Sequence, residues 1–374
     1  MRVLILGGTG AMGVSLVDIL VKGGHEVYVT SRRKHKDSEH IHYLQGDAHD
    51  LMWLESITAN QDFTAMVDFM IYTSRQFKER HDKLLSMAKQ YVFLSSSRVY
   101  SDSSDKPITE ETPRLLDSTT DKEYLSTDEY ALAKAREENI LRDSSRQNYT
   151  IIRPYITYND ERLQLGTMEK EMWLYRGLRG RSIVIPKDMA DSLTTMTYGY
   201  DVAEGIAGIL GKKEALGEAF HIVAPKPIRW QDVAVIYQNV LGRITGKRPD
   251  IKYLSDSQEF SRVFNNKYQV YCDRLYTRIF DSSKIGHVGG KSNFVDIEAG
   301  LAMCLQNFIK KGNPFHSIDW VIQGWFDKKT GEKTSLVEID SAKDRIKYIL
   351  GRHFGYADPK CFMRRIVKLF RSNN

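Results

Sequence analysis

Three glycines between a short apolar run and a helical pattern constrain this chain more than any other feature. The run Val3–Leu6 leads into Gly7, Gly10 and Gly13, and a helical pattern follows from about Ala11 to Val21. This spacing lets the backbone turn tightly, approach a pyrophosphate closely and bring the helix near the strand. The helix N-terminus then offers amide hydrogens to the phosphates. We therefore predict a dinucleotide site. Its phosphate cradle would comprise Gly7, Thr9, Gly10, Ala11, Met12 and Gly13.

Apolar runs and helical patterns continue to alternate over residues 1–155. Strands are expected at Val3–Leu6, His25–Thr30, Ile41–Leu44, Ala65–Ile71, Tyr91–Leu94 and Thr150–Arg153. Further helices are expected at Arg75–Lys89 and Asp128–Arg142. Strands separated by helices imply a parallel sheet that is covered on both faces. We predict an α/β fold with a Rossmann-type doubly wound parallel sheet, completed by chain near 195–225 and binding its ligand at the carboxyl ends of the strands.

The pattern is less regular beyond Pro154. We expect residues 156–336 to form mainly a smaller, discontinuous α+β substrate lobe, and residues 337–374 a helical, basic C-terminal extension. Within that extension, Phe362, Ile366 and Phe370 fall on one helical stripe among basic residues. A basic amphipathic helix of this kind at 360–371 either contacts an anionic membrane surface or docks on the protein or a partner subunit.

Charge and cysteine content exclude some classes of protein. The net charge is +6, and residues 360–374 carry five lysines and arginines with no acid, so the rest of the chain carries +1. A nearly neutral body argues against a general nucleic-acid-binding surface. Cys272, Cys304 and Cys361 are scattered, which indicates neither a disulfide framework nor a zinc site and is typical of a cytoplasmic protein. No metal site is expected.

The end of the second expected strand bears on which dinucleotide is bound. NAD-specific folds usually place an acid there to hold the ribose hydroxyls, but residues 30–34 contain none. Ser31 and Arg32 suit a 2′-phosphate instead, because a guanidinium makes charge-assisted bonds to phosphate. The sequence thus favours NADP over NAD, with a solvated basic loop as the alternative interpretation. Gly46-Asp47, after the third strand, is expected to contact the adenine edge.

Further short motifs follow the glycine loop along the chain. They are Gly46-Asp47, Ser95–Tyr100, Pro107–Glu110, Tyr130–Lys134, Arg153-Pro154 and Asp201–Ala203. With these pieces in this order, the chain resembles the extended short-chain dehydrogenase/reductase family, also called the NAD-dependent epimerase/dehydratase family, to about residue 310. The resemblance implies hydride-transfer chemistry on a sugar linked to a nucleotide.

The resemblance also implies roles for three side chains. Tyr130 and Lys134 lie four apart on an expected helix and so share one face. A phenol ordinarily titrates near pH 10, and a nearby ammonium stabilises its deprotonated form, which suits Tyr130 to acid/base work. Lys134 would also hold the nicotinamide ribose. Ser96 would hydrogen-bond the reacting oxygen, with Ser95 and Ser97 as alternatives one residue away.

Two departures from the family pattern narrow the function. Dehydratases of the family carry Asp and Glu where this chain has Ser97 and Arg98, so a 4,6-dehydratase is disfavoured. Many members place an arginine for the substrate diphosphate where this chain has Thr194. Four other basic residues are candidates to bind the diphosphate in place of that arginine. They are Arg153, also expected among the cofactor contacts, and Arg274, Arg278 and Lys284. The alternative interpretation of the segment Tyr271–Lys284 is an ordinary solvated loop.

The sequence thus predicts an NADP-dependent epimerase or reductase of a nucleotide sugar, acting in the biosynthesis of polysaccharide or glycan precursors. The basic Ser31–Arg32 segment leans to a reductase without deciding between the two. A homodimer is expected from the family's use of the helices that flank the catalytic one. The alternative is an atypical family member, similar to the chloroplast stem-loop binding proteins, that binds RNA or senses the cofactor without catalysis.

Overall fold

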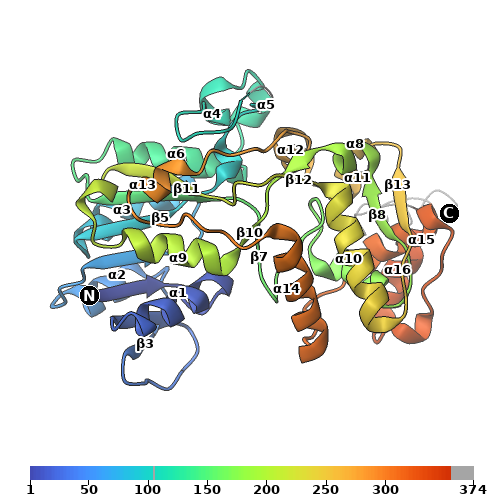
Figure 1. Cartoon of the computed structure of the whole chain (residues 1–374), viewed down its shortest axis with the longest axis horizontal. Coiled ribbons are helices and arrows are strands. Elements are labelled where there is room, and N and C mark those ends of the chain that lie inside the picture. The colour runs from blue at the N-terminus through green and yellow to red at the C-terminus, as the bar shows by residue number, and fades with distance from the viewer. Residues whose placement is uncertain (104–105, 355–374) are drawn as a thin grey trace, which may run out of the picture. The chain divides into compact units, whose positions relative to one another are not determined.

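The structure is a computed structural model that describes residues 1–103 and 106–354, in two compact units (Figure 1). The first unit comprises Met1–Glu161, Leu193–Ile228 and Tyr276–Gly300, apart from residues 104–105. The second comprises Arg162–Ser192, Arg229–Leu275 and the described chain from Leu301 onward. The basic stripe expected at 360–371 lies outside the described residues. Within the described ranges, no helix is long and apolar enough to cross a membrane.

The first unit contains a seven-stranded parallel sheet, as the strand–helix alternation predicts. Its spatial order is β11-β6-β5-β4-β1-β2-β3, so the order reverses beside β1. The strands are β1 Arg2–Leu6, β2 Glu26–Ser31, β3 Ile41–Gln45, β4 Ala65–Asp68, β5 Gln90–Leu94, β6 Tyr149–Pro154 and β11 Glu218–Ile222. Ligands of such sheets bind outside the carboxyl ends of the strands at this switch point. The predicted fold class is confirmed.

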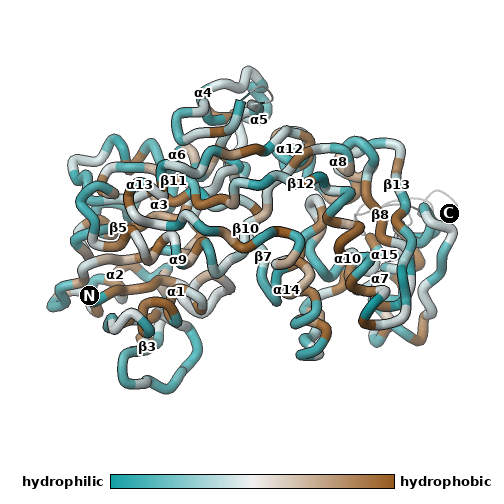
Figure 2. The backbone as a smooth tube through the Cα atoms, in the orientation of Figure 1, coloured by the Kyte–Doolittle hydropathy of each residue, from teal (hydrophilic) through white to brown (hydrophobic). Residues whose placement is uncertain are grey.

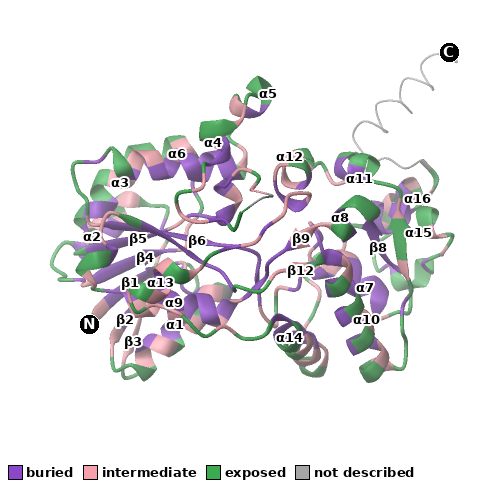
Figure 3. Cartoon of the chain, turned by 45° about the horizontal axis from the view of Figure 1, so that its top comes forward, coloured by how far each residue is buried: buried purple, intermediate pink, exposed green. Residues whose placement is uncertain are grey.

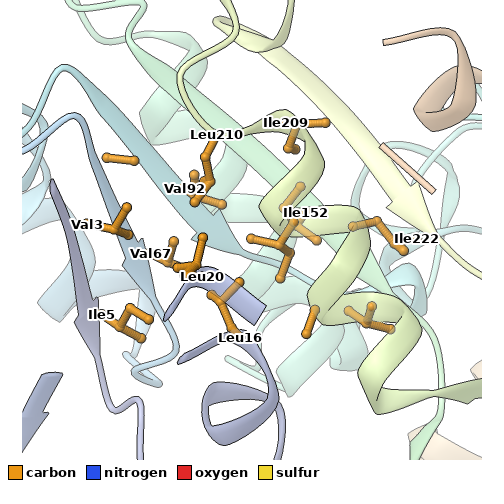
Figure 4. Packing of buried hydrophobic residues seen from close by; sticks show 14 of the residues in the cluster. Val3, Ile5, Leu16, Leu20, Val67, Val92, Ile152, Ile209, Leu210 and Ile222 are labelled. Atoms are coloured by element: carbon orange, nitrogen blue, oxygen red, sulfur yellow. The ribbon is translucent and has the colours of Figure 1, made fainter. Parts of the chain in front are cut away.

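Both faces of the sheet are covered, because side chains alternate along each strand. On β1, Val3 and Ile5 pack in one core with α1 (Ala11–Lys22) and α9 (Gly199–Ile209), as Figure 4 shows. Leu4 and Leu6 pack in another core, which takes side chains from α2, α3 and α6. These helices are α2 Leu51–Thr58, α3 Ser74–Ser86 and α6 Tyr130–Arg142. The strands are accordingly almost wholly buried at the centre of the sheet (Figure 3).

Shorter elements complete the first unit. They are η1 Ser97–Val99, α4 Leu115–Ser118, α5 Lys122–Leu125, β7 Thr157–Tyr158, β9 Leu193–Thr194, β10 Thr197–Tyr198, η2 Lys213–Ala215 and α13 Ser283–His287. Two elements cross a boundary between the units, namely β12 Ile228–Arg229 and α14 Ile297–Lys311. Of these, α4, α5 and the short strands were not predicted from the sequence.

The fourth strand is shorter than its apolar pattern predicts. β4 ends at Asp68, whereas the pattern extends to Ile71. The Asp68 carboxylate accepts a hydrogen bond from the backbone N–H of Met70 at 2.9 Å, and the hydroxyl of Tyr91 donates to it at 2.7 Å. A side chain that captures the backbone two residues on forms a turn and ends the ladder. The apolar residues after Asp68 therefore lie beyond the carboxyl end of β4.

The second unit is mainly helical, with one parallel strand pair, β13 and β8. Its elements are α7 Lys170–Gly177, β8 Ile183–Pro186, α8 Lys187–Asp191, α10 Trp230–Thr245, β13 Ile251–Leu254, α11 Ser257–Val263, α12 Lys267–Gln269, η3 Val270–Arg274, α15 Trp320–Thr330, η4 Leu336–Glu338 and α16 Ala342–Phe354. The part of the expected extension that is described belongs to this unit. Trp320 and Tyr348, from α15 and α16, share one buried cluster with Tyr175.

Candidate active site

Close backbone contacts shape the glycine loop between β1 and α1. A Cβ atom on Gly13 would lie 2.5 Å from the carbonyl oxygen of Gly8, so a larger residue would have to displace backbone there. Gly7 has a φ of +71°, which favours glycine. Gly10 precedes α1 without a side-chain cap, so the amides of the first turn, from Ala11 onward, remain for a ligand. These features fit the pyrophosphate of a dinucleotide.

A hollow of about 220 Å³ lies beside this loop, at the carboxyl ends of β1, β2 and β3. Its lining includes six of the residues predicted to contact the cofactor, which are Gly7, Thr9, Ser31, Arg32, Gly46 and Asp47. It also includes Thr30, Ala48, His49 and Met70. Of this second group, Thr30 is the last residue of a predicted strand and could have been identified from that position.

Two residues of the loop after β2 contact the hydroxyl of Ser31. The backbone N–H of Arg33 donates to Ser31 Oγ at 3.2 Å, and His35 Nε2 lies 3.0 Å from the same oxygen. The His35 ring stacks on Tyr43, with centroids 4.7 Å apart. Arg32 is exposed at the lip of the hollow. This hydrophilic loop between β2 and β3 is coloured teal in Figure 2. A hydroxyl and a guanidinium from this loop thus line the same hollow.

The structure distinguishes the three consecutive serines after β5. The hydroxyl of Ser95 donates to Glu138 Oε1 at 2.6 Å, and that of Ser97 donates to the carbonyl of Arg153 at 2.7 Å. Ser96 Oγ accepts from the backbone N–H of Arg98 at 3.2 Å, and among the described residues it donates to no acceptor. Ser96 is thus the serine that keeps its hydroxyl hydrogen for a ligand.

Tyr130 is the first residue of α6 and is 37% exposed. The guanidinium carbon of Arg98 lies 5.2 Å from the centre of its ring, within the range of a cation–π contact. Arg98 is itself held by an ion pair with Glu129 at 2.6 Å. The side chain that replaces the dehydratase acid therefore packs on the candidate acid/base.

Lys134 lies one turn further along α6 and is 2% exposed. Its Nζ atom is 2.9 Å from Glu137 Oε2 and 4.6 Å from the centre of the Phe93 ring. Burial, the largest influence, raises the pKa of Glu137 to about 7, although the neighbouring Lys134 favours its charged form. Lys134 therefore forms a buried ion pair with an acid that the sequence analysis did not identify.

Arg153 has a different environment from the one expected of a cofactor contact. Its guanidinium donates to both carboxylate oxygens of Glu138, to the hydroxyl of Tyr100 and to the carbonyl of Glu110. Arg114 also binds Glu138. Burial opposes the charge of Glu138, but Arg153 and Ser95 together hold its pKa below the ordinary value. Arg153 thus joins strand β6 to helix α6, and its donors are directed into the protein.

The basic residues considered as substitutes for Thr194 all have partners within their own units. Arg274 donates to the carbonyl of Gly166 and pairs with Asp273, whereas Arg278 donates to the carbonyls of Tyr100 and Ser101. Lys284 pairs with Glu218 at 2.8 Å. Thr194 itself is 1% exposed. Because each lysine or arginine of this set already has a protein partner, none is left unpaired to bind a diphosphate.

Spacing within α6 places two acids beside Lys134, although it does not reveal that they are buried. Glu138 follows Lys134 by four residues, so the two share a face, and Glu137 follows by three. Sequence patterns alone place such residues on a solvated face, and burial cannot be read from spacing.

In the described part of the chain, no group of His, Cys, Asp and Glu side chains is arranged to hold a metal ion.

Comparison with known proteins identifies relatives of the chain. Over 251 residues it is 28% identical to the chloroplast stem-loop binding protein of 41 kDa b from Arabidopsis thaliana, covering 62% of this chain and 61% of that protein. Over 135 residues it is 30% identical to a UDP-glucose 4-epimerase from Lactobacillus helveticus, covering 30% of this chain and 41% of that one. The chain therefore matches less than two thirds of the length of either relative.

Solved structures share the fold. The UDP-glucose 4-epimerase of Thermotoga maritima, solved with UDP-glucose, superposes with a TM-score of 0.63 and is 18% identical in sequence. The match covers 84% of this chain and 100% of that one. The sequence profile of the NAD dependent epimerase/dehydratase family matches residues 3–222, more than half of the chain. The chain belongs to the NAD dependent epimerase/dehydratase family.

Proposed function

We propose that this protein is an NADP-dependent epimerase or reductase of a nucleotide sugar, in which Ser96, Tyr130 and Lys134 carry out the chemistry. The observation that carries the proposal is the different use of the three serine hydroxyls. Ser95 and Ser97 donate to protein acceptors, whereas Ser96 retains its hydrogen beside the helix that bears Tyr130. If the three serines served only to cap the end of β5, no serine hydroxyl would need to differ from the other two in this way.

In the proposed chemistry a sugar hydroxyl is oxidised, with the cofactor accepting the hydride and a side chain accepting the proton. The bound nicotinamide supplies a hydride acceptor for a hydrogen on a sugar carbinol carbon. Tyr130, in its deprotonated form, takes the proton of the same carbinol, which leaves a keto sugar. Ser96 donates a hydrogen bond to the reacting oxygen, and Lys134 stabilises the deprotonated phenol and binds the nicotinamide ribose. Tyr130 would return the proton to the oxygen when hydride is returned to the carbon, and the product would be the epimer where the keto sugar has first turned over in the site.

NADP is proposed over NAD because of the loop after β2. Ser31 Oγ and the exposed Arg32 line the hollow there, and residues 30–34 offer no acid to bind a ribose diol. Charge-assisted bonds from a guanidinium suit a 2′-phosphate. The family as a whole is described as NAD dependent, so the choice of NADP is specific to this chain's own loop.

A dehydratase remains disfavoured by the site. Expelling water needs an acid and a base beside the sugar, and the corresponding positions hold Ser97 and Arg98. Ser97 donates to a backbone carbonyl and Arg98 pairs with Glu129. An epimerase and a reductase are both compatible with the three side chains. An epimerase would regenerate its cofactor in each turnover, whereas a reductase would consume one NADPH.

The test is turnover of a panel of UDP- and dTDP-linked sugars and keto sugars in the presence of NADP(H), followed by absorbance and by NMR of the sugar product. Tyr130→Phe should lower kcat by about 10²- to 10⁴-fold while leaving NADPH affinity within about threefold. Tyr253→Phe, at an exposed tyrosine of the second unit, is the control. Full activity of Tyr130→Phe on an accepted substrate would exclude this assignment.

A second candidate function is RNA binding, which the similarity to the chloroplast stem-loop binding protein favours. It predicts binding of a labelled RNA hairpin that weakens steeply as salt rises from about 50 to 200 mM, because counterion release dominates such affinity. The first proposal predicts no such binding by the nearly neutral body. A variant ending at Asp358 separates a contribution of the basic C-terminal residues from that of the body.

A further inference from the structure

A lysine and a glutamate are buried together on the face of α6 that also bears Tyr130. Lys134 is 2% exposed and Glu137 is 0% exposed, and their charged atoms are 2.9 Å apart. The pair is three residues apart on one helix, so its geometry is fixed by the helix itself. A fully buried ion pair gains little net stability, because both ions lose their hydration. This cost makes a role beyond stability worth testing.

The environment of Glu137 is poorly suited to a permanent negative charge. One oxygen, Oε2, contacts Lys134, but Oε1 accepts no hydrogen bond from any residue that the structure describes. A buried carboxylate oxygen without a donor carries a large desolvation cost, which protonation relieves.

The other charged and titratable groups near Glu137 reinforce this tendency. Asp128, before α6, and Asp68, at the end of β4, both disfavour a negative charge on Glu137. The hydroxyl of Tyr91 donates to Asp68 rather than to Glu137. Lys134 is the cation that opposes them. Burial leads these influences and raises the pKa of Glu137 to about 7, so its charge changes within the physiological range.

We infer that Glu137 is a positioning residue that holds the ammonium of Lys134 and, by gaining or losing a proton, sets the net charge that this pair presents to the dinucleotide. The inference rests on the proposed function, which places Lys134 against the nicotinamide ribose. Protonated Glu137 leaves the full positive charge of Lys134 acting on the cofactor and on Tyr130. Ionised Glu137 cancels much of that charge. Glu137 itself touches neither substrate nor cofactor in this account.

The test compares NADPH affinity at pH 6 and pH 8 by fluorescence titration of wild type and Glu137→Gln. Wild type should lose about tenfold more affinity than the variant between the two values, the effect of one added negative charge at several ångströms. The cofactor's own phosphates are the same in both experiments, so their contribution cancels in the comparison. Glu55→Gln, which removes a glutamate paired with Lys83 on the surface, is the matched control and should follow wild type.

Parallel pH dependences of wild type and Glu137→Gln would overturn the inference, and so would failure of wild type to bind either dinucleotide. Glu137→Met, which replaces the carboxyl with an apolar group of similar length, makes the same comparison if the glutamine variant does not fold. The proposed function fails separately. If NADPH binds with the expected pH difference but no nucleotide sugar is turned over, the role of Glu137 in cofactor binding stands and the catalytic assignment does not.

Discussion

The guanidinium of Arg153 binds both carboxylate oxygens of Glu138, with nitrogen–oxygen distances of 2.8 and 2.6 Å. Neither side chain is more than 1% exposed. This forked pair ties β6 to α6, and α6 carries Tyr130 and Lys134. The placement of the candidate catalytic residues therefore depends on an ion pair that lies beneath them.

Removing one partner of this pair should be strongly destabilising. Arg153→Met leaves the buried Glu138 carboxylate with fewer cations, and such losses typically cost about 3–5 kcal/mol. The measurement is urea unfolding monitored by circular dichroism. Arg75→Met, which breaks an exposed ion pair with Glu79 on α3, should leave the free energy of unfolding nearly unchanged. Similar stabilities for the two variants would show that the buried pair does not hold α6.

The glycine loop gives a second prediction. Gly13→Ala would place a Cβ 2.5 Å from the Gly8 carbonyl oxygen, whereas Gly10→Ala would place one 3.5 Å from the Gly7 carbonyl oxygen, an ordinary contact. Dinucleotide affinity, measured by calorimetry, should fall more than about tenfold in Gly13→Ala and clearly less in Gly10→Ala. Equal losses in both would show that crowding at Gly13 is not what shapes the cradle.

Arg32 should decide between the two dinucleotides. Loss of a hydrogen bond to a charged group typically costs about 1.5–3 kcal/mol, so Arg32→Ala should weaken NADPH binding about 10- to 100-fold. NADH binding should change little, because NADH has no 2′-phosphate. Arg33→Ala is the control, since Arg33 is not part of the lining of the hollow. A uniform effect of Arg32→Ala on both cofactors would contradict the proposed specificity.

His221 gives a prediction about pH. Its Nε2 atom donates to the carbonyl of Asp281 at 2.7 Å, and Tyr100 Oη lies 3.3 Å from Nδ1, so the ring is neutral and burial lowers its pKa. The unfolded chain therefore takes up a proton before the folded one as pH falls below about 6.5, and stability is lost in that direction. Thermal unfolding from pH 7.5 to 5 should show a steeper loss in wild type than in His221→Gln. Equal slopes would contradict this account.

Sequence patterns predicted the sheet well because they follow local rules. The glycine spacing, the apolar runs and Tyr130–Lys134 depend on neighbours within a few residues, and the structure has the corresponding strands and helices. The end of β4 was wrong because the carboxylate of Asp68 captures backbone that apolar periodicity assigns to the strand. What sets Ser96 apart depends on Ser95 and Ser97 having acceptors 43 and 56 residues away, on Glu138 and Arg153. Local patterns contain no information on such contacts.

The most direct test of the central claim is native mass spectrometry of the freshly purified protein, combined with its absorbance spectrum and a titration with NADP(H) and NAD(H). The account predicts that the chain binds one dinucleotide, with NADP(H) preferred. Cofactor retained through purification would favour an epimerase, which recycles it, and an empty protein that takes up NADPH and consumes it with a keto sugar would favour a reductase. A folded protein that binds neither dinucleotide would contradict the account.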